Sequence, residues 1–192
     1  MLITRDFKTS SQLFIDGIAT FSCTELCSYD TFIYYTIIIC IITLPRTELY
    51  TKIINNPQII AIIRNQPELQ IFLNSLYICD YKLFFEKLVY IYKSIQNDQY
   101  LYIHIKYIIK EYRILSYIQF LTAYKSVLLQ TMAEKFGISL TLLDTELSHF
   151  ISINRINAKI DKVNGIIVSN RIDNKNLQYL NVIKKGKSNK NT

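Results

Sequence analysis

The stretch VLLQTMAEKFGISLTLLDTELSHFISINRINAKIDKVNGIIVSN, residues 127–170, decides the fold, because three elements follow one another in it. Leu128, Met132 and Phe136 recur at intervals of four residues, which is typical of the buried face of a helix. Gly137 comes next, where a glycine in the left-handed conformation commonly ends a helix. The pattern predicts a helix that ends at this glycine.

A second helix is predicted in the segment LLDTELSHFISINRI, residues 142–156. Thr141 and Asp144 have the spacing of a capping box at its N-terminus. Asn154 is expected to turn the chain afterwards, since asparagine tolerates the left-handed conformation. The buried face of this helix is predicted to consist of Leu143, Leu147, Phe150 and Ile151.

Two strands are predicted after the second helix, over residues 157–163 and 165–170. Asn164 and Gly165 separate them and favour a tight hairpin turn. Two helices followed by a hairpin make a winged helix-turn-helix.

The residues before this stretch predict helix after helix with short connectors. Glycine and proline are rare, at 4 and 3 in 192 residues, which favours helices over an all-β fold. Ser10 or Ser11 is expected to cap one helix, and Asp30 the next, which Pro45 ends. Further helices are expected over 46–54, after Pro57, from Pro67, over 81–95, and as one long helix or a pair within 100–125. Apolar faces with short connectors are typical of a stacked helical array.

The run FIYYTIIICIITLP, residues 32–45, raises the question of a membrane span. The uncharged segment that contains it extends only from Thr31 to Pro45, short of the ~20 residues that a spanning helix needs. We therefore expect a core helix with most of its circumference buried, and no membrane association.

No catalytic, cofactor-binding or metal-binding residue is predicted. Cys23, Cys27, Cys40 and Cys79 lack the paired spacing of a metal site, and histidine occurs only at 104 and 149. No nucleophile elbow or glycine-rich phosphate loop is present. The chain is therefore expected not to be an enzyme, and to need no cofactor.

Nucleic-acid binding is the alternative that a winged helix brings with it. The second helix has Asp144, Glu146 and His149 but no Lys or Arg, so phosphate would repel it. Lys106, Lys110 and Arg113 share one face of the preceding helical segment, and RNA could contact them. A solvated helix face is the interpretation favoured for these three residues.

Several segments together resemble the PCI domain of the 26S proteasome lid family that includes non-ATPase regulatory subunit 6. These segments are MAEKFG, the D-x-E-L-x-x-F-I pattern of residues 144–151, KIDKVN, NRIDNKNLQY and IKKG. FLNSLYICDYKLFFEKL and TLPRTELYTKII extend the resemblance, which runs from about Phe14 to Gly186. The paralogous signalosome subunit ranks second, because NRIDNKNLQY fits the proteasomal family better.

The resemblance implies a mainly α fold, with a right-handed helical-repeat array followed by a winged helix. The expected domains are the array over 1–113, the winged helix over 114–172 and a C-terminal segment with a basic polar tail over 173–192. It also implies a non-catalytic scaffold in the regulatory particle lid, acting in ubiquitin-dependent proteolysis in cytoplasm and nucleus. The implied partners are other PCI-containing lid subunits, with the ATPase ring as a further contact.

The wing is the expected partner interface, because an exposed strand edge can extend a neighbour's sheet. The predicted interface residues are Lys159, Ile160, Asp161, Lys162, Val163, Ile166, Ile167 and Val168. The alternative is that the apolar members Ile160, Val163, Ile167 and Val168 pack on the domain's own helices.

The chain also departs from the family pattern. Family members are expected to be about twice as long, with this chain starting near their midpoint and lacking their long C-terminal helix. Leu177, Ile172 and Asn154 stand where the family has tryptophan, proline and glycine. A fragment and a reduced subunit both remain open.

Overall fold

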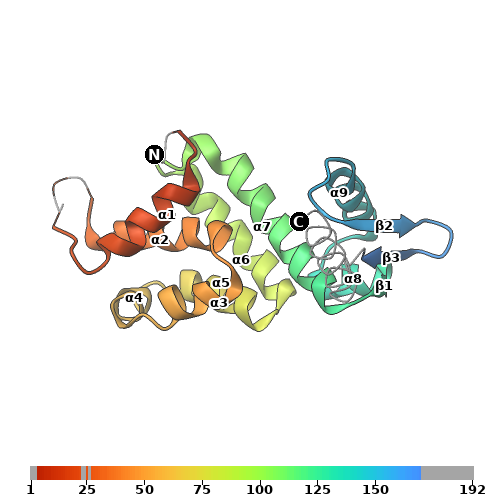
Figure 1. The fold of residues 1–192 in the computed structure, drawn as a ribbon, viewed down its shortest axis with the longest axis horizontal. Helices are drawn as coiled ribbons and strands as arrows, with labels where there is room; N and C mark the ends of the chain where they lie inside the picture. Colours follow the sequence, from red (N-terminus) through yellow and green to blue (C-terminus); the bar gives the residue numbers. More distant parts are fainter. Residues whose placement is uncertain (1–3, 23–24, 26, 170–192) are drawn as a thin grey trace, which may run out of the picture.

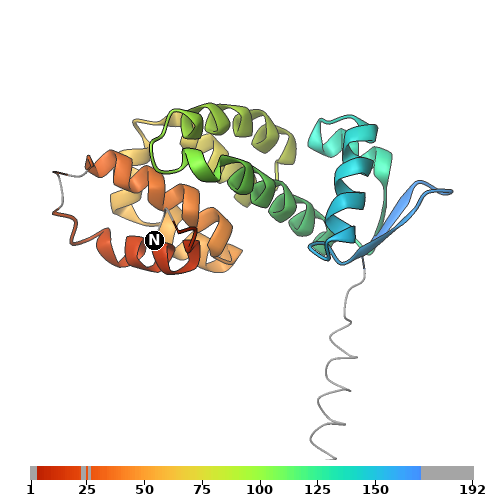
Figure 2. The same ribbon diagram turned by 90° about the horizontal axis from the view of Figure 1, so that it is seen from above.

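The computed structural model describes residues 4–22, 25 and 27–169 of the chain. Helices α1 to α7 form a stacked array, and a winged helix lies at the far end of α7 (Figures 1 and 2). The fold is mainly α with one small sheet, as predicted. The handedness of the array stays a prediction.

The helices and strands follow one another with short connectors. The array consists of α1 (Phe7–Gly17), α2 (Tyr29–Thr43), α3 (Arg46–Leu49), the π-helical turn η1 (Tyr50–Ile54), α4 (Pro57–Ile63), α5 (Pro67–Ile78), α6 (Tyr81–Gln96), the 3-10 turn η2 (Tyr102–His104) and α7 (Ile105–Ala123). The winged helix consists of β1 (Ser126–Leu128), α8 (Leu129–Phe136), α9 (Leu140–Ser152), β2 (Ala158–Asp161) and β3 (Ile166–Ser169). Both α4 and α5 begin at a proline, as predicted.

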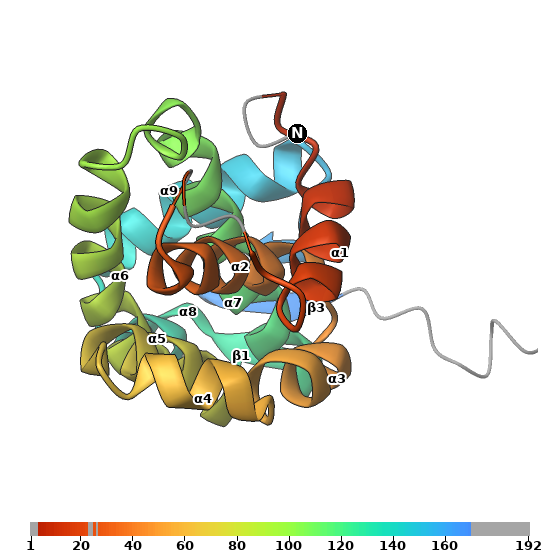
Figure 3. The same ribbon diagram turned by 90° about the vertical axis from the view of Figure 1, so that its left-hand side faces the viewer.

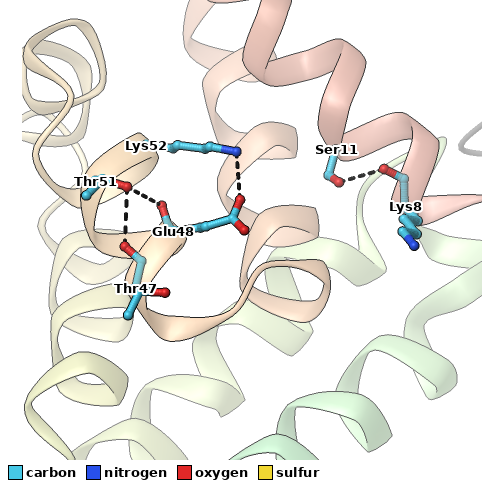
Figure 4. Close-up of polar contacts among 6 residues, drawn as sticks. All are labelled: Lys8, Ser11, Thr47, Glu48, Thr51 and Lys52. Carbon is cyan, nitrogen blue, oxygen red and sulfur yellow. Dashed lines mark hydrogen bonds and ion pairs between the residues drawn. The ribbon is translucent and has the colours of Figure 1, made fainter. Parts of the chain in front are cut away.

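The predicted N-cap of α1 was wrong. The cap is Asp6, whose carboxylate accepts a hydrogen bond from the backbone N–H of Thr9 at 3.2 Å. Ser10 and Ser11 lie inside the helix, where their hydroxyls donate to the carbonyls of Asp6 and Lys8. Figure 4 shows the Ser11 bond.

Two further caps also lie earlier in the chain than predicted. Ser28 caps α2 in place of Asp30, and accepts from the N–H of Thr31 at 3.2 Å. Ser139 caps α9 in place of Thr141, and accepts from the N–H of Leu142 at 3.3 Å. Neighbouring Ser, Thr and Asp residues all have an oxygen that can cap, so their order alone does not select one.

The apolar helix α2 is the centre of the array. Every residue from Tyr35 to Ile41 is buried, so the helix is enclosed around its circumference, as predicted. In the end-on view of Figure 3, α2 lies between α1 and α6, and it also packs against α7 and α4. The hydroxyl of Tyr112 on α7 donates to the carbonyl of Ile38 at 2.7 Å. Among the described residues, no helix is long and apolar enough to cross a membrane.

The buried apolar residues form two clusters that meet along α7. The first contains Tyr112 together with the α2 isoleucines, and the second contains Ile114 together with the winged-helix core. Phe85 of α6 packs against both. The predicted domain limit at 113/114 lies at this division and stays a prediction, as does the limit at 172/173, which lies outside the described residues.

The winged helix has one strand more than the sequence indicated. Leu128 was predicted on the face of a helix, but it lies in β1 and is 52% exposed. The helix α8 starts one residue later and buries Leu129, Met132 and Phe136. Gly137 and Asn154 have the predicted positive φ angles, 65° and 56°.

Candidate partner interface

The three strands of the wing form an antiparallel sheet in the order β1-β3-β2. Because β3 is the central strand, Ile166, Ile167 and Val168 lie between two paired neighbours and cannot supply a free edge. The edge that Ala158–Asp161 forms has no further strand among the described residues. Of the predicted interface residues, only those on β2 and in the turn thus lie at an edge.

The sheet has a buried face and a solvent face. Ile167 is fully buried, and Ile160 packs half-buried against the same core. Of the two alternatives for Ile160 and Ile167, the structure thus shows packing on the domain's own helices. Lys159 is exposed and pairs across the ladder with Val168, which is also exposed.

The turn between β2 and β3 is longer than predicted. It spans residues 162–165, and Gly165 has a φ of 64°. The Asp161 carboxylate accepts from the backbone N–H groups of Val163 and Asn164, and from the Asn164 amide at 2.7 Å. These bonds, chiefly those from Asn164, lower the pKa of Asp161 below its ordinary value. Val163 is 94% exposed at the tip.

Leu128 is the interface candidate that the sequence pattern did not indicate. It lies opposite Ile166 in the ladder, two residues along the strand from the pair of Ser126 and Val168. Leu128, Ile166 and Val168 therefore share the solvent face of the sheet, and we call them the wing patch. The only signal for β1 was the β-branched Val127 before Leu128, inside a longer apolar run.

A partly buried ion pair joins the winged helix to the array. Arg155, directly after the turn at Asn154, donates to both carboxylate oxygens of Glu111 on α7, at 2.9 and 2.5 Å. Glu111 is buried, and its hydrogen bonds to Arg155 raise the pKa of that guanidinium. Two parallel bonds of this kind fix the orientation of the two groups as well as their distance.

A second polar contact ties α9 to α7. Glu146 accepts from the Tyr117 hydroxyl at 2.7 Å and pairs with Arg113 at 2.6 Å. Burial, followed by this hydrogen bond, raises the pKa of Tyr117 above its usual range. The interpretation of Arg113 as part of a solvated face was wrong, because its guanidinium is half-buried between Glu146 and the ring of Phe85.

The two histidines lie apart from each other. His104 is buried with its ring edge against Phe7, whereas His149 is exposed on α9. Within the described residues, no group of three or more His, Cys, Asp or Glu side chains could hold a metal ion.

Two family models match the sequence. The model of the PCI domain matches residues 89–171, which include α7 and the whole winged helix. The model of 26S proteasome subunit RPN7 matches residues 1–52.

Curated relatives named for the proteasome match most of the chain. The 26S proteasome non-ATPase regulatory subunit 6 homolog of Arabidopsis thaliana is 44% identical over 95% of this chain and 47% of its own length. The 26S proteasome regulatory subunit RPN7 of Saccharomyces cerevisiae is 38% identical over 96% of this chain and 44% of its own. The COP9 signalosome complex subunit 1 of Arabidopsis thaliana is 28% identical over 73% of the chain.

The chain spans about half the length of the curated proteasomal relatives that it matches. Its sequence agrees with theirs across that span, and the signalosome relative is less similar over a shorter part. The chain therefore belongs to the PCI-domain family of 26S proteasome non-ATPase regulatory subunit 6.

Proposed function

We propose that this chain is a non-catalytic, structural part of the lid of a proteasome regulatory particle, and that its winged helix binds other PCI-containing subunits there. Through that assembly it would contribute to ubiquitin-dependent protein degradation. The names of its relatives support membership of the proteasome regulatory particle, and the winged helix of the PCI domain supports contact with other PCI-containing subunits.

The wing sheet is the observation on which this proposal depends. Its β2 edge has no further strand among the described residues, and backbone groups at such an edge can pair with a neighbour's strand. The wing patch puts Val168 on the solvent side of β3, beside Lys159 of that edge strand, and Leu128 on the same face of β1, the strand at the opposite side of the sheet. The Arg155–Glu111 pair ties the connector between α9 and β2 to α7 of the array.

The test replaces apolar side chains of the wing patch by polar ones of similar size. The variant Leu128→Gln/Val168→Thr is compared with Leu13→Gln/Val89→Thr, which makes the same changes at exposed residues of the array. Each tagged full chain is purified from its source cells, and the PCI-containing subunits that come with it are quantified. We expect a loss of these subunits for the wing variant alone. Equal recovery for both variants would contradict the proposed interface.

The identity of the companions separates the lid from the signalosome. Subunits of the regulatory particle should co-purify, and signalosome subunits should not. We also propose contact with the ATPase ring and residence in cytoplasm and nucleus, which cross-linking of the assembled particle and imaging of the tagged chain can check.

Neither nucleic-acid binding nor catalysis is supported by a specific observation. The helix α9 has no Lys or Arg, and its Asp144 pairs with Lys162 at 3.4 Å. We therefore propose no nucleic-acid partner and no membrane partner. Retention of RNA or DNA after a wash in high salt, or reaction with an active-site label, would contradict this part of the proposal.

A further inference from the structure

A pocket of about 590 Å³ lies where the array meets the winged helix, and none of the residues that line it belongs to the edge strand β2. Residues at the start of α3 and α6, at the end of α5 and α7, and on α8 form its walls. We call it the junction pocket. Its chemically distinctive residues are the aromatic Tyr81, Phe120 and Tyr124 and the cations Arg46 and Lys135.

The aromatic side of the junction pocket is packed in place. Tyr81 stacks on Phe136 with ring centroids 4.7 Å apart, and Phe120 meets Tyr81 edge-on at 5.7 Å. Tyr124 packs on Phe120 at 4.9 Å and remains 47% exposed. The pocket therefore offers a preformed apolar surface with an accessible ring at its rim, which suits an inserted apolar side chain.

The polar side of the pocket has an uncompensated positive charge. No carboxylate lines it, and among the described residues neither Arg46 nor Lys135 forms an ion pair. Arg46 is held in position, since it donates to the Tyr77 carbonyl at 2.6 Å and lies over the Tyr77 ring.

The carboxylates nearest in sequence to the pocket walls are already engaged. Asp80 caps α6 by accepting from the N–H of Leu83. Glu134 accepts a hydrogen bond from Gln130 within α8. Neither carboxylate lines the pocket or pairs with Arg46 or Lys135, so both cations are left for a group from outside these walls to pair with.

We propose that the junction pocket binds an acidic segment of a partner protein, with an apolar side chain placed against Phe120 and Tyr124 and carboxylates placed near Arg46 and Lys135. Charge complementarity selects this occupant. The pocket that α6, α7 and α8 line is the contrast, because the carboxylate of Glu86 is in its wall and the guanidinium of Arg113 there is already paired with Glu146 of α9. This surface is separate from the wing edge and does not depend on the proposed function.

The test places a photo-cross-linker in the junction pocket of the full chain. Tyr124 is replaced by p-benzoylphenylalanine in the source cells, the cells are irradiated, and the cross-linked partner peptide is sequenced. We expect a segment with at least two Asp or Glu residues close to an aliphatic or aromatic residue. A cross-link to a segment without carboxylates, to RNA, or to no protein at all overturns the proposal.

Neutralising the two cations tests the electrostatic part. In Arg46→Gln/Lys135→Gln, the cross-link yield should fall about fivefold, the change in affinity expected from two exposed ion pairs. The control Lys93→Gln/Lys106→Gln removes the same charge from exposed positions elsewhere and should leave the yield unchanged. Equal yields in the two variants, at matched thermal stability, overturn the proposal. The wing-patch variant serves as a second comparison. Where the cross-linked segment belongs to a protein other than the PCI-containing subunits, this variant should lose those subunits and keep the cross-link.

Discussion

Replacing Arg155 by methionine should destabilise the contact between the winged helix and the array. The change removes both hydrogen bonds to Glu111, at 2.9 and 2.5 Å, and leaves that carboxylate buried without its partner. Breaking a fully buried pair costs about 3–5 kcal/mol. The Arg155 side chain is 42% exposed, so water screens its end of the pair. We therefore expect the free energy of unfolding to fall by about 2–3 kcal/mol, which is less than for a fully buried pair and close to the loss of charge-assisted hydrogen bonds to a buried group.

Urea unfolding of the full chain, followed by circular dichroism, measures this loss. A double-mutant cycle with Glu111→Gln should give a coupling energy of about 1–2 kcal/mol between the two residues. Lys52→Met is the control, because it breaks the exposed Lys52–Glu48 pair of Figure 4 and should cost less than about 0.5 kcal/mol. A cost for Arg155→Met as small as that of the control, or a coupling energy near zero, would refute the reasoning.

Four further predictions concern the core, the turns, the wing and the response to pH. Ile38→Ala should cost about 2–5 kcal/mol, and the exposed Ile78→Ala less than about 0.5 kcal/mol, because only the first opens a cavity; chemical denaturation measures both. Gly137→Ala should cost more than Gly165→Ala in thermal unfolding. Both glycines have a positive φ, but only at Gly137 would a Cβ lie 3.0 Å from the Lys82 side chain. Lys159→Glu/Lys162→Glu should reduce co-purification of PCI-containing subunits with little change in stability, and unchanged incorporation would argue against the β2 edge. Burial raises the pKa of Tyr34 to about 12, whereas an unfolded tyrosine ionises near 10. The contribution of Tyr34 to the free energy of unfolding should therefore be fully present below about pH 10 and be lost as the pH rises toward 12, and Tyr34→Phe should lose less stability over this range. Tyrosinate absorbance and circular dichroism are recorded together, and complete ionisation of the tyrosines in a chain that is still folded would contradict this prediction.

The helices and the winged-helix motif could be predicted because their signals are local. Pro57 and Pro67 begin helices, Gly137 ends one and Asn154 turns the chain, each through a backbone preference of the residue itself. The first residue of several helices could not be placed, since Ser10, Asp30 and Thr141 each have a neighbour able to cap the same turn.

The candidate site was less predictable than the fold around it. Ile160 and Ile167 were expected at an interface, but the sheet puts both on the buried face. Leu128 was assigned to a helix, although it belongs to the wing patch. The partner contact itself stays a proposal.

The sequence by itself determined the succession of helices, the hairpin that follows them and the burial of α2, because periodicity and turn residues act within a few neighbours along the chain. Only the tertiary structure decided that β3 is the central strand, since its pairing with β1 joins segments about forty residues apart. It also decided that Glu111 meets Arg155 and that Glu146 meets Arg113, which no spacing in the sequence indicates. The junction pocket likewise depends on the tertiary structure, because packing brings Arg46 and Lys135 to one pocket although they are far apart along the chain.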